Sequence, residues 1–156
     1  MKELLNVVLC IVFLFNVGGC EKDEPLECSG DSAEQVDAFY NEEFATMQCF
    51  LRNIGTTEKH VNLIIETQSD YEKYFDCTST PPIVDFEKYS MLAGRFQHHQ
   101  CARFDSQQVL LCNNKLYYKV GLREQDCQAI TNVFYMVVIE KKHENTAVTF
   151  EVNFTN

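Results

Sequence analysis

The histidines are the first side chains whose type and spacing could support chemistry. His98 and His99 are adjacent, and adjacent residues on a strand point to opposite faces, so they are poorly placed to share a metal ion. His143 is followed by Glu144, but Ala147 stands where an H-E-x-x-H zinc motif needs its second histidine. The sequence also lacks G-x-S-x-G, a phosphate-binding loop, G-x-G-x-x-G and Cys-x-x-Cys. We therefore predict solvated loop histidines, no catalytic residue, no metal and no cofactor.

Cysteines are the second group of reactive side chains. Of the eight in the chain, Cys10 lies within an apolar amino-terminal run and Cys20 follows that run. The other six are Cys28, Cys49, Cys77, Cys101, Cys112 and Cys127. No two of these have the short spacing of a zinc-binding pair. An even number of cysteines in an exported chain indicates disulfide bonds, so we expect a disulfide-stapled domain.

The amino terminus has the pattern of an export signal. Residues 4–15 are apolar apart from Asn6, and Lys2 precedes them. The run is shorter than the roughly 20 residues that span a bilayer, and it has the length of the apolar core of a secretory signal. The small residues at 17–19 then suit a signal peptidase.

The segment Val17-Gly18-Gly19-Cys20 resembles the bacterial lipobox, in which a cysteine after small residues becomes the acylated first residue of the mature chain. The resemblance implies a lipoprotein signal peptide at 1–19 and a lipid on Cys20. Several acyl chains anchor a protein stably, so the mature protein would need no transmembrane helix. The alternative is an ordinary cleaved signal whose neighbouring cysteine joins a disulfide.

Residues 20–32 are predicted to be an acidic tether. Glu21-Lys22-Asp23-Glu24 resembles the export signal that some Gram-negative bacteria place after the lipidated cysteine, which implies an outer-membrane protein exposed at the cell surface. A plain solvated linker remains the alternative. The chain has 13 Lys and Arg against 23 Asp and Glu, a net charge of −10, which argues against nucleic acid as a partner.

Residues 33–156 are expected to form a single α+β domain with a mainly antiparallel sheet and one short helix. Ser69 and Glu72 are spaced as a capping box, which predicts a helix over about 69–75. Asn113 and Asn114 predict a two-residue hairpin turn. Runs of apolar and alternating residues predict strands at 44–51, 60–66, 83–96, 101–111, 115–122, 132–140 and 147–154.

The hairpin narrows the choice of disulfide pairs. With the turn at 113–114, Cys101 falls opposite residue 126, and one residue of slack or a bulge near Gly121 would bring Cys127 within bonding distance. The same construction on the preceding strand places Cys112 opposite residue 87, near Cys77. The predicted pairs are therefore Cys101–Cys127 and Cys77–Cys112, and elimination leaves Cys28–Cys49.

The order of elements over about residues 58–154 resembles the carboxy-terminal domain of protease-complex-associated lipoproteins. The resemblance rests on the helix S-D-Y-E-K-Y-F, on Asp85-Phe86 and Met91-Leu92-Ala93-Gly94, and on the late strand T-N-V-F-Y-M-V-V-I-E-K-K. The family carries a glycine-rich segment where this chain has residues 97–101, Q-H-H-Q-C. The resemblance implies an accessory, non-enzymatic role with protein partners.

We therefore expect a membrane-anchored envelope lipoprotein that binds a protein partner. The alternatives are an inhibitor-like or scaffold module for a secreted protease, and an envelope hydrolase that uses a histidine and an acidic residue. The hydrolase predicts a concave cluster around His98 or His143, whereas the two binding roles predict an exposed apolar patch.

Overall fold

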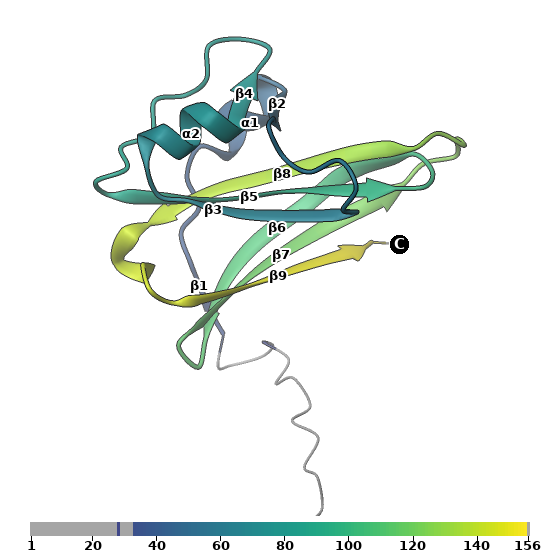
Figure 1. The fold of residues 1–156 in the computed structure, drawn as a ribbon. Coiled ribbons are helices and arrows are strands. Elements are labelled where there is room, and N and C mark those ends of the chain that lie inside the picture. Colours follow the sequence, from purple (N-terminus) through teal and green to yellow (C-terminus); the bar gives the residue numbers. More distant parts are fainter. Residues whose placement is uncertain (1–27, 29–32, 156) are drawn as a thin grey trace, which may run out of the picture.

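The described part of the chain, residue 28 and residues 33–155 of a computed structural model, folds into three layers (Figure 1). We call them the outer sheet, the central sheet and the cap. The prediction of a mainly β domain with little helix is confirmed, although the structure has two short α-helices rather than one. The proposed signal peptide, Cys20 and most of the tether lie outside the described residues. Within the described residues, no helix is long and apolar enough to cross a membrane.

The central sheet has three antiparallel strands, and two of them are largely buried on both faces. In spatial order they are β3 (His60–Ile65), β5 (Tyr89–His98) and β8 (Thr131–Glu140). Alternate residues of β5 face opposite layers: Leu92 packs toward the outer sheet, whereas Met91 and Ala93 pack toward the cap. This double burial explains why β5 and β8 are almost continuously apolar instead of alternating with polar residues.

The outer sheet has four strands and supplies the second wall of the core. In spatial order they are β1 (Glu34–Gln35), β6 (Ala102–Cys112), β7 (Lys115–Glu124) and β9 (Ala147–Phe154). The predicted hairpin turn is confirmed, with Asn113 and Asn114 at φ angles of 49° and 59°. The chain reaches β9 from the end of β8 through the 3₁₀ helix η2 (Lys141–His143), and β9 therefore runs parallel to β7.

The cap covers the face of the central sheet that points away from the outer sheet. Its elements are α1 (Asn41–Thr46), β2 (Cys49–Leu51), α2 (Gln68–Tyr74) and β4 (Phe75–Cys77). The predicted strand at 44–51 is wrong over its first half. Phe44 and Met47 lie one helical turn apart and both pack into the cap core, so helix α1 forms there and only the last three residues are extended.

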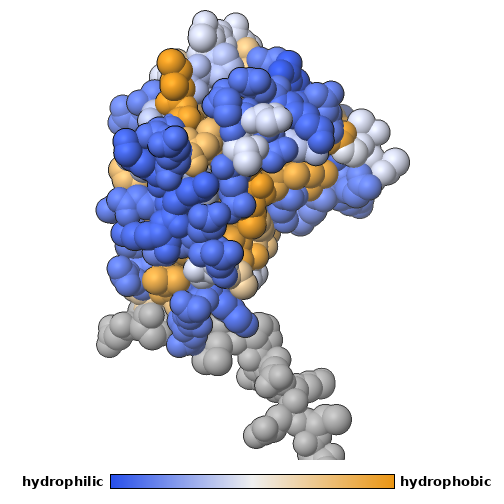
Figure 2. All heavy atoms as spheres, turned by 60° about the vertical axis from the view of Figure 1, so that its left-hand side comes forward, coloured by the Kyte–Doolittle hydropathy of each residue, from blue (hydrophilic) through white to orange (hydrophobic). Residues whose placement is uncertain are grey.

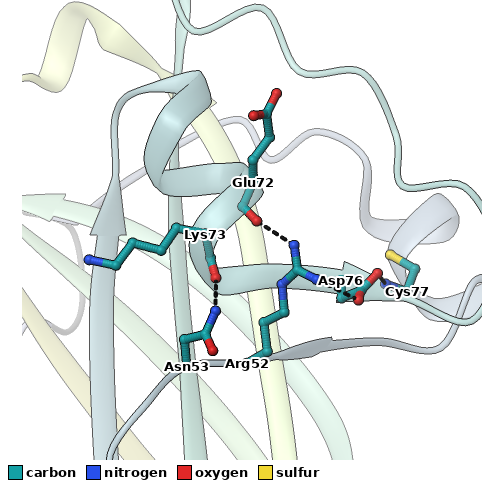
Figure 3. A network of polar contacts seen from close by, with 6 residues as sticks. All are labelled: Arg52, Asn53, Glu72, Lys73, Asp76 and Cys77. Atoms are coloured by element: carbon teal, nitrogen blue, oxygen red, sulfur yellow. Dashed lines mark hydrogen bonds and ion pairs between the residues drawn. The ribbon is translucent and has the colours of Figure 1, made fainter.

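Helix α2 begins close to its predicted start, but a different residue caps it. Thr67 Oγ1 accepts a hydrogen bond from Asp70 N at 3.1 Å, so Thr67 and not Ser69 is the N-cap. At the other end, Arg52 and Asn53 donate to the carbonyl oxygens of Glu72 and Lys73 (Figure 3). These carbonyls are among the last four of the helix and have no partner inside it.

The same arginine also ties the helix end to strand β4. Arg52 Nη1 lies 3.1 Å from Asp76 Oδ2, and Asp76 Oδ1 accepts from Cys77 N at 2.9 Å (Figure 3). Both charged side chains are partly exposed, which limits the free energy that their ion pair contributes. The network therefore positions α2 on the β2–β4 pair, and it has the character of a structural contact.

The two long sides of the sandwich are closed differently. On one side, residues 34–39 cross from sheet to sheet: Val36 N donates to Val109 O in β6, and Phe39 N donates to Val138 O in β8, both at 2.9 Å. The opposite side is bordered by β3 and β9, each of which pairs with one neighbouring strand only among the described residues. Residues 34–39, which we call the strap, therefore close one side of the sandwich, and the other side is open.

Candidate functional site

The described residues contain three disulfides, but only one predicted pair is confirmed. Cys101 and Cys127 are bonded, with their Cα atoms 5.3 Å apart. A bulge was predicted near Gly121 of β7. The structure has it on the opposite strand, where Asp105 of β6 is the extra residue. This shift brings Gln125 opposite Cys101. A tight turn, in which Cys127 N donates to Gln125 O at 2.8 Å, then returns Cys127 to its partner.

The other two predicted pairs, Cys77–Cys112 and Cys28–Cys49, are wrong. The structure bonds Cys49 to Cys77 across the β2–β4 pair, with a Cα separation of 3.9 Å, and Cys28 to Cys112, with a Cα separation of 5.9 Å. The prediction assumed that the strand before β6 is its neighbour in one sheet. In the structure β5 belongs to the central sheet and β6 to the outer sheet, so Cys112 lies far from the start of β5 in the sheet order.

Cys28 is held on the outward-facing side of the outer sheet. It packs with Leu110 and Cys112, and Lys119 Nζ donates to Cys28 O at 2.8 Å. The cap lies on the far side of the central sheet from this point (Figure 1). The described residue nearest to the proposed lipid site is therefore fixed at the end of the molecule opposite the cap.

The two adjacent histidines have different environments, and only one of them is exposed as predicted. His99 is exposed, but His98 ends β5 and is buried, with Nε2 2.9 Å from Glu124 Oε1 at the end of β7. Its ring also lies against Phe154, so His98 joins the two sheets at this end of the sandwich. No group of three metal-ligating side chains occurs in the part of the chain that the structure describes.

The open side of the sandwich holds a cavity of about 360 Å³, which we call the lateral cavity. Its apolar lining comes from both sheets and consists of Ile64, Leu92, Leu116, Ile139, Ala147 and Val148. In Figure 2 a band of apolar surface runs between two hydrophilic parts of the molecule. Ile64 keeps 48% of its surface exposed although it faces the interior, which shows that the edge of the core is not sealed here.

The polar lining of the lateral cavity is acidic and includes a buried hydroxyl. Glu66, Glu140 and Glu144 contribute carboxylates, and Lys142 beside Glu140 lowers the pKa of that glutamate. Ser90 is only 5% exposed, and its Oγ has no hydrogen-bond partner among the described residues. A buried hydroxyl without a partner costs roughly 1–3 kcal/mol, and such groups in folded proteins are rare.

His143 also lines the lateral cavity, next to the acidic residues that a hydrolase would need. The predicted concavity around His143 therefore exists. Within residues 33–155, however, no hydrogen bond joins His143 to Ser90 or to a carboxylate, so a nucleophile, base and orienting acid are not assembled there. The arrangement of polar groups is better suited to holding a positively charged group than to activating a nucleophile.

A second cavity, of about 190 Å³, lies between the cap and β6 and is a weaker candidate. Its amides satisfy one another: Gln107 Nε2 donates to Asn41 Oδ1 at 3.0 Å, and Tyr118 Oη donates to Gln107 Oε1 at 2.5 Å. The burial of Tyr118 raises its pKa, so the hydroxyl stays protonated as this bond requires. No polar atom of this network needs a ligand.

The fold and its cavity define a disulfide-bonded β-sandwich with one capped face and one open side. In the comparisons with known proteins, the chain matches no protein-family model, no curated protein and no solved structure.

The lateral cavity was not predicted from the sequence. Its one visible signal is the strand HVNLII (60–65), which has no charged residue or proline, although the sequence does not say that this strand lies at an edge.

Proposed function

We propose that the chain is a lipoprotein anchored to the bacterial outer membrane through a lipid on Cys20, and that its domain binds a protein partner at the cell envelope without catalysing a reaction. The observation that carries the binding role is the lateral cavity, where an apolar floor, an acidic rim and two strand edges without a partner among the described residues occur together. Exposed apolar surface framed by polar residues is typical of protein-interaction sites.

The disulfides support a location outside the cytoplasm. Three bonded pairs persist in an oxidising compartment and are rare where thiols are kept reduced. The position of Cys28 supports the anchored arrangement, because it fixes the residue from which the tether would start on the face of the outer sheet that points away from the cap.

The proposal is tested first at the anchor. In cells fed a fatty-acid analogue, the wild-type protein should incorporate the label and Cys20→Ser should not. Protease added to intact cells then distinguishes surface exposure from the periplasmic side, which decides whether residues 21–24 act as an export signal. Labelled Cys20→Ser protein would refute the anchor.

The binding role is tested by site-specific crosslinking in intact cells. A photoreactive amino acid at position 64 should give a discrete protein adduct, whereas the same amino acid at position 130 should not. Ile130 is the matched control because it is also an exposed isoleucine, at 72%, but it precedes β8, two strands away from β3. No adduct from either position, or equal adducts from both, would refute the assignment of binding to the open side.

A further inference from the structure

We infer that strand β3 is completed by an extended segment of the partner, which pairs with its free edge and places a lysine or arginine side chain in the lateral cavity. The inference rests on the proposed protein-binding role and specifies its chemistry. The partner segment would alternate apolar side chains with a central cation. Strand addition of this kind obtains affinity from backbone hydrogen bonds and specificity from side-chain pockets.

The backbone of β3 has the hydrogen-bonding groups that such a segment needs. Gln97 N donates to Lys59 O at 2.8 Å, so this is a hydrogen-bonded pair of the antiparallel ladder. Bonded and non-bonded pairs alternate along such a ladder, and His60, Asn62 and Ile64 therefore turn their N–H and C=O groups away from β5. In the described structure these outward groups have no backbone partner.

The other edges of the central and outer sheets are less suited to a new strand. The outer edge of β8 is bridged by Phe39, and that of β6 is covered by β1. Strand β9 carries the charged Glu151, and its apolar side chains already pack against the core. Strand β3 carries no lysine, proline or bulge of the kinds that protect edges, and its inward Ile64 is half exposed.

A strand added to β3 would extend the central sheet over the mouth of the lateral cavity. Its inward side chains would then meet Ile64 and the cavity floor. The aliphatic stem of a lysine or arginine fits an apolar floor, and its charged end fits a rim that holds Glu66 and Glu144. The partnerless Ser90 Oγ is an acceptor for the same cation.

The charge of the chain argues for a basic partner segment over a second copy of this protein. Pairing of β3 with β3 of another copy would bring together two chains of net charge −10 and two acidic rims. A cationic segment is attracted by the same field, which speeds association and selects the partner.

The test uses the full-length lipidated protein in detergent and three synthetic peptides. The first alternates valine and threonine around a central lysine, the second replaces that lysine with glutamate, and the third is N-methylated at alternate residues so that one backbone edge cannot pair. The lysine peptide should bind and slow hydrogen exchange at the amides of His60, Asn62 and Ile64. The glutamate and N-methylated peptides should bind at least about tenfold more weakly.

Protein variants provide the second arm. Ile64→Lys adds a charge to the mouth and removes an apolar contact, and it should weaken the lysine peptide about tenfold, whereas the control Ile130→Lys should not. If Ile64→Lys does not fold, Ile64→Thr makes the same comparison with a smaller expected loss. Equal binding of the lysine and glutamate peptides, binding without protection of β3, or protection of β9 instead would overturn the inference. Crosslinks from position 64 without peptide binding would leave protein binding intact and refute strand addition.

Discussion

Replacing Ser90 with alanine should stabilise the folded protein, although most substitutions of buried residues destabilise it. The hydroxyl of Ser90 is taken out of water on folding and finds no partner among the described residues. Its removal should recover most of the desolvation cost of that group, about 1–2 kcal/mol of the free energy of unfolding. For a domain of this size, that gain corresponds to an increase in Tm of roughly 4–8 °C.

The assay is thermal unfolding of wild type and Ser90→Ala, followed by circular dichroism under non-reducing conditions. Ser106→Ala is the matched control, because Ser106 lies exposed on β6, and its Tm should change by less than about 2 °C. The same Ser90→Ala variant should bind the lysine peptide more weakly. A fall in Tm would refute the reasoning, because it would mean that the hydroxyl is satisfied in the folded protein.

Three further outcomes test the packing, the disulfides and the buried hydroxyls. Gly94→Ala should destabilise the domain by roughly 1–3 kcal/mol in denaturant unfolding, because a Cβ at that position would overlap the ring of Tyr135. Breaking Cys28–Cys112, which spans 84 residues, should cost about 4–5 kcal/mol by the loop-entropy relation. This is about 1 kcal/mol more than breaking the bond that spans 26 residues at the end of the β6–β7 hairpin. Burial raises the pKa of both Tyr118 and Tyr135 above the ordinary value of 10.0, so the unfolded chain loses these protons before the folded one does. The free energy of unfolding should therefore fall as the pH rises through 10 and beyond, and an ultraviolet titration should show these two tyrosines still protonated where exposed ones have ionised.

Local patterns in the sequence predicted local structure well. The turn at Asn113–Asn114 followed from two residues that tolerate positive φ, and the register of that hairpin led to the Cys101–Cys127 bond. The short helix near 69–75 was predicted from the spacing of Ser69 and Glu72. Its true N-cap, Thr67, was missed because the same spacing occurs twice. Thr67 and Ser69 are each followed three residues later by an acidic residue, so the sequence does not show which of them caps the helix.

Longer-range features could not be predicted, because they depend on which sheet each strand joins. The run from 83 to 112 looks like two successive antiparallel strands, yet the chain changes sheets between β5 and β6. That change moved Cys112 away from Cys77 and made two predicted disulfides wrong. The lateral cavity has the same origin, since a strand such as β3 is an edge only when the neighbouring strands have all been placed.

The bond between Cys28 and Cys112 also determines how the domain bears mechanical load. If the chain is pulled from its amino-terminal side, tension enters the fold at Cys28 and passes through the sulfur atoms to the end of β6. The strap at 34–39 is then bypassed, because it lies inside the loop that the disulfide closes. A pulling force on the domain would therefore not detach the strap, which holds the two sheets together on that side. Reducing this disulfide would place the strap directly in the line of force, held by little more than β1 and a single bridge to β8 among the described residues.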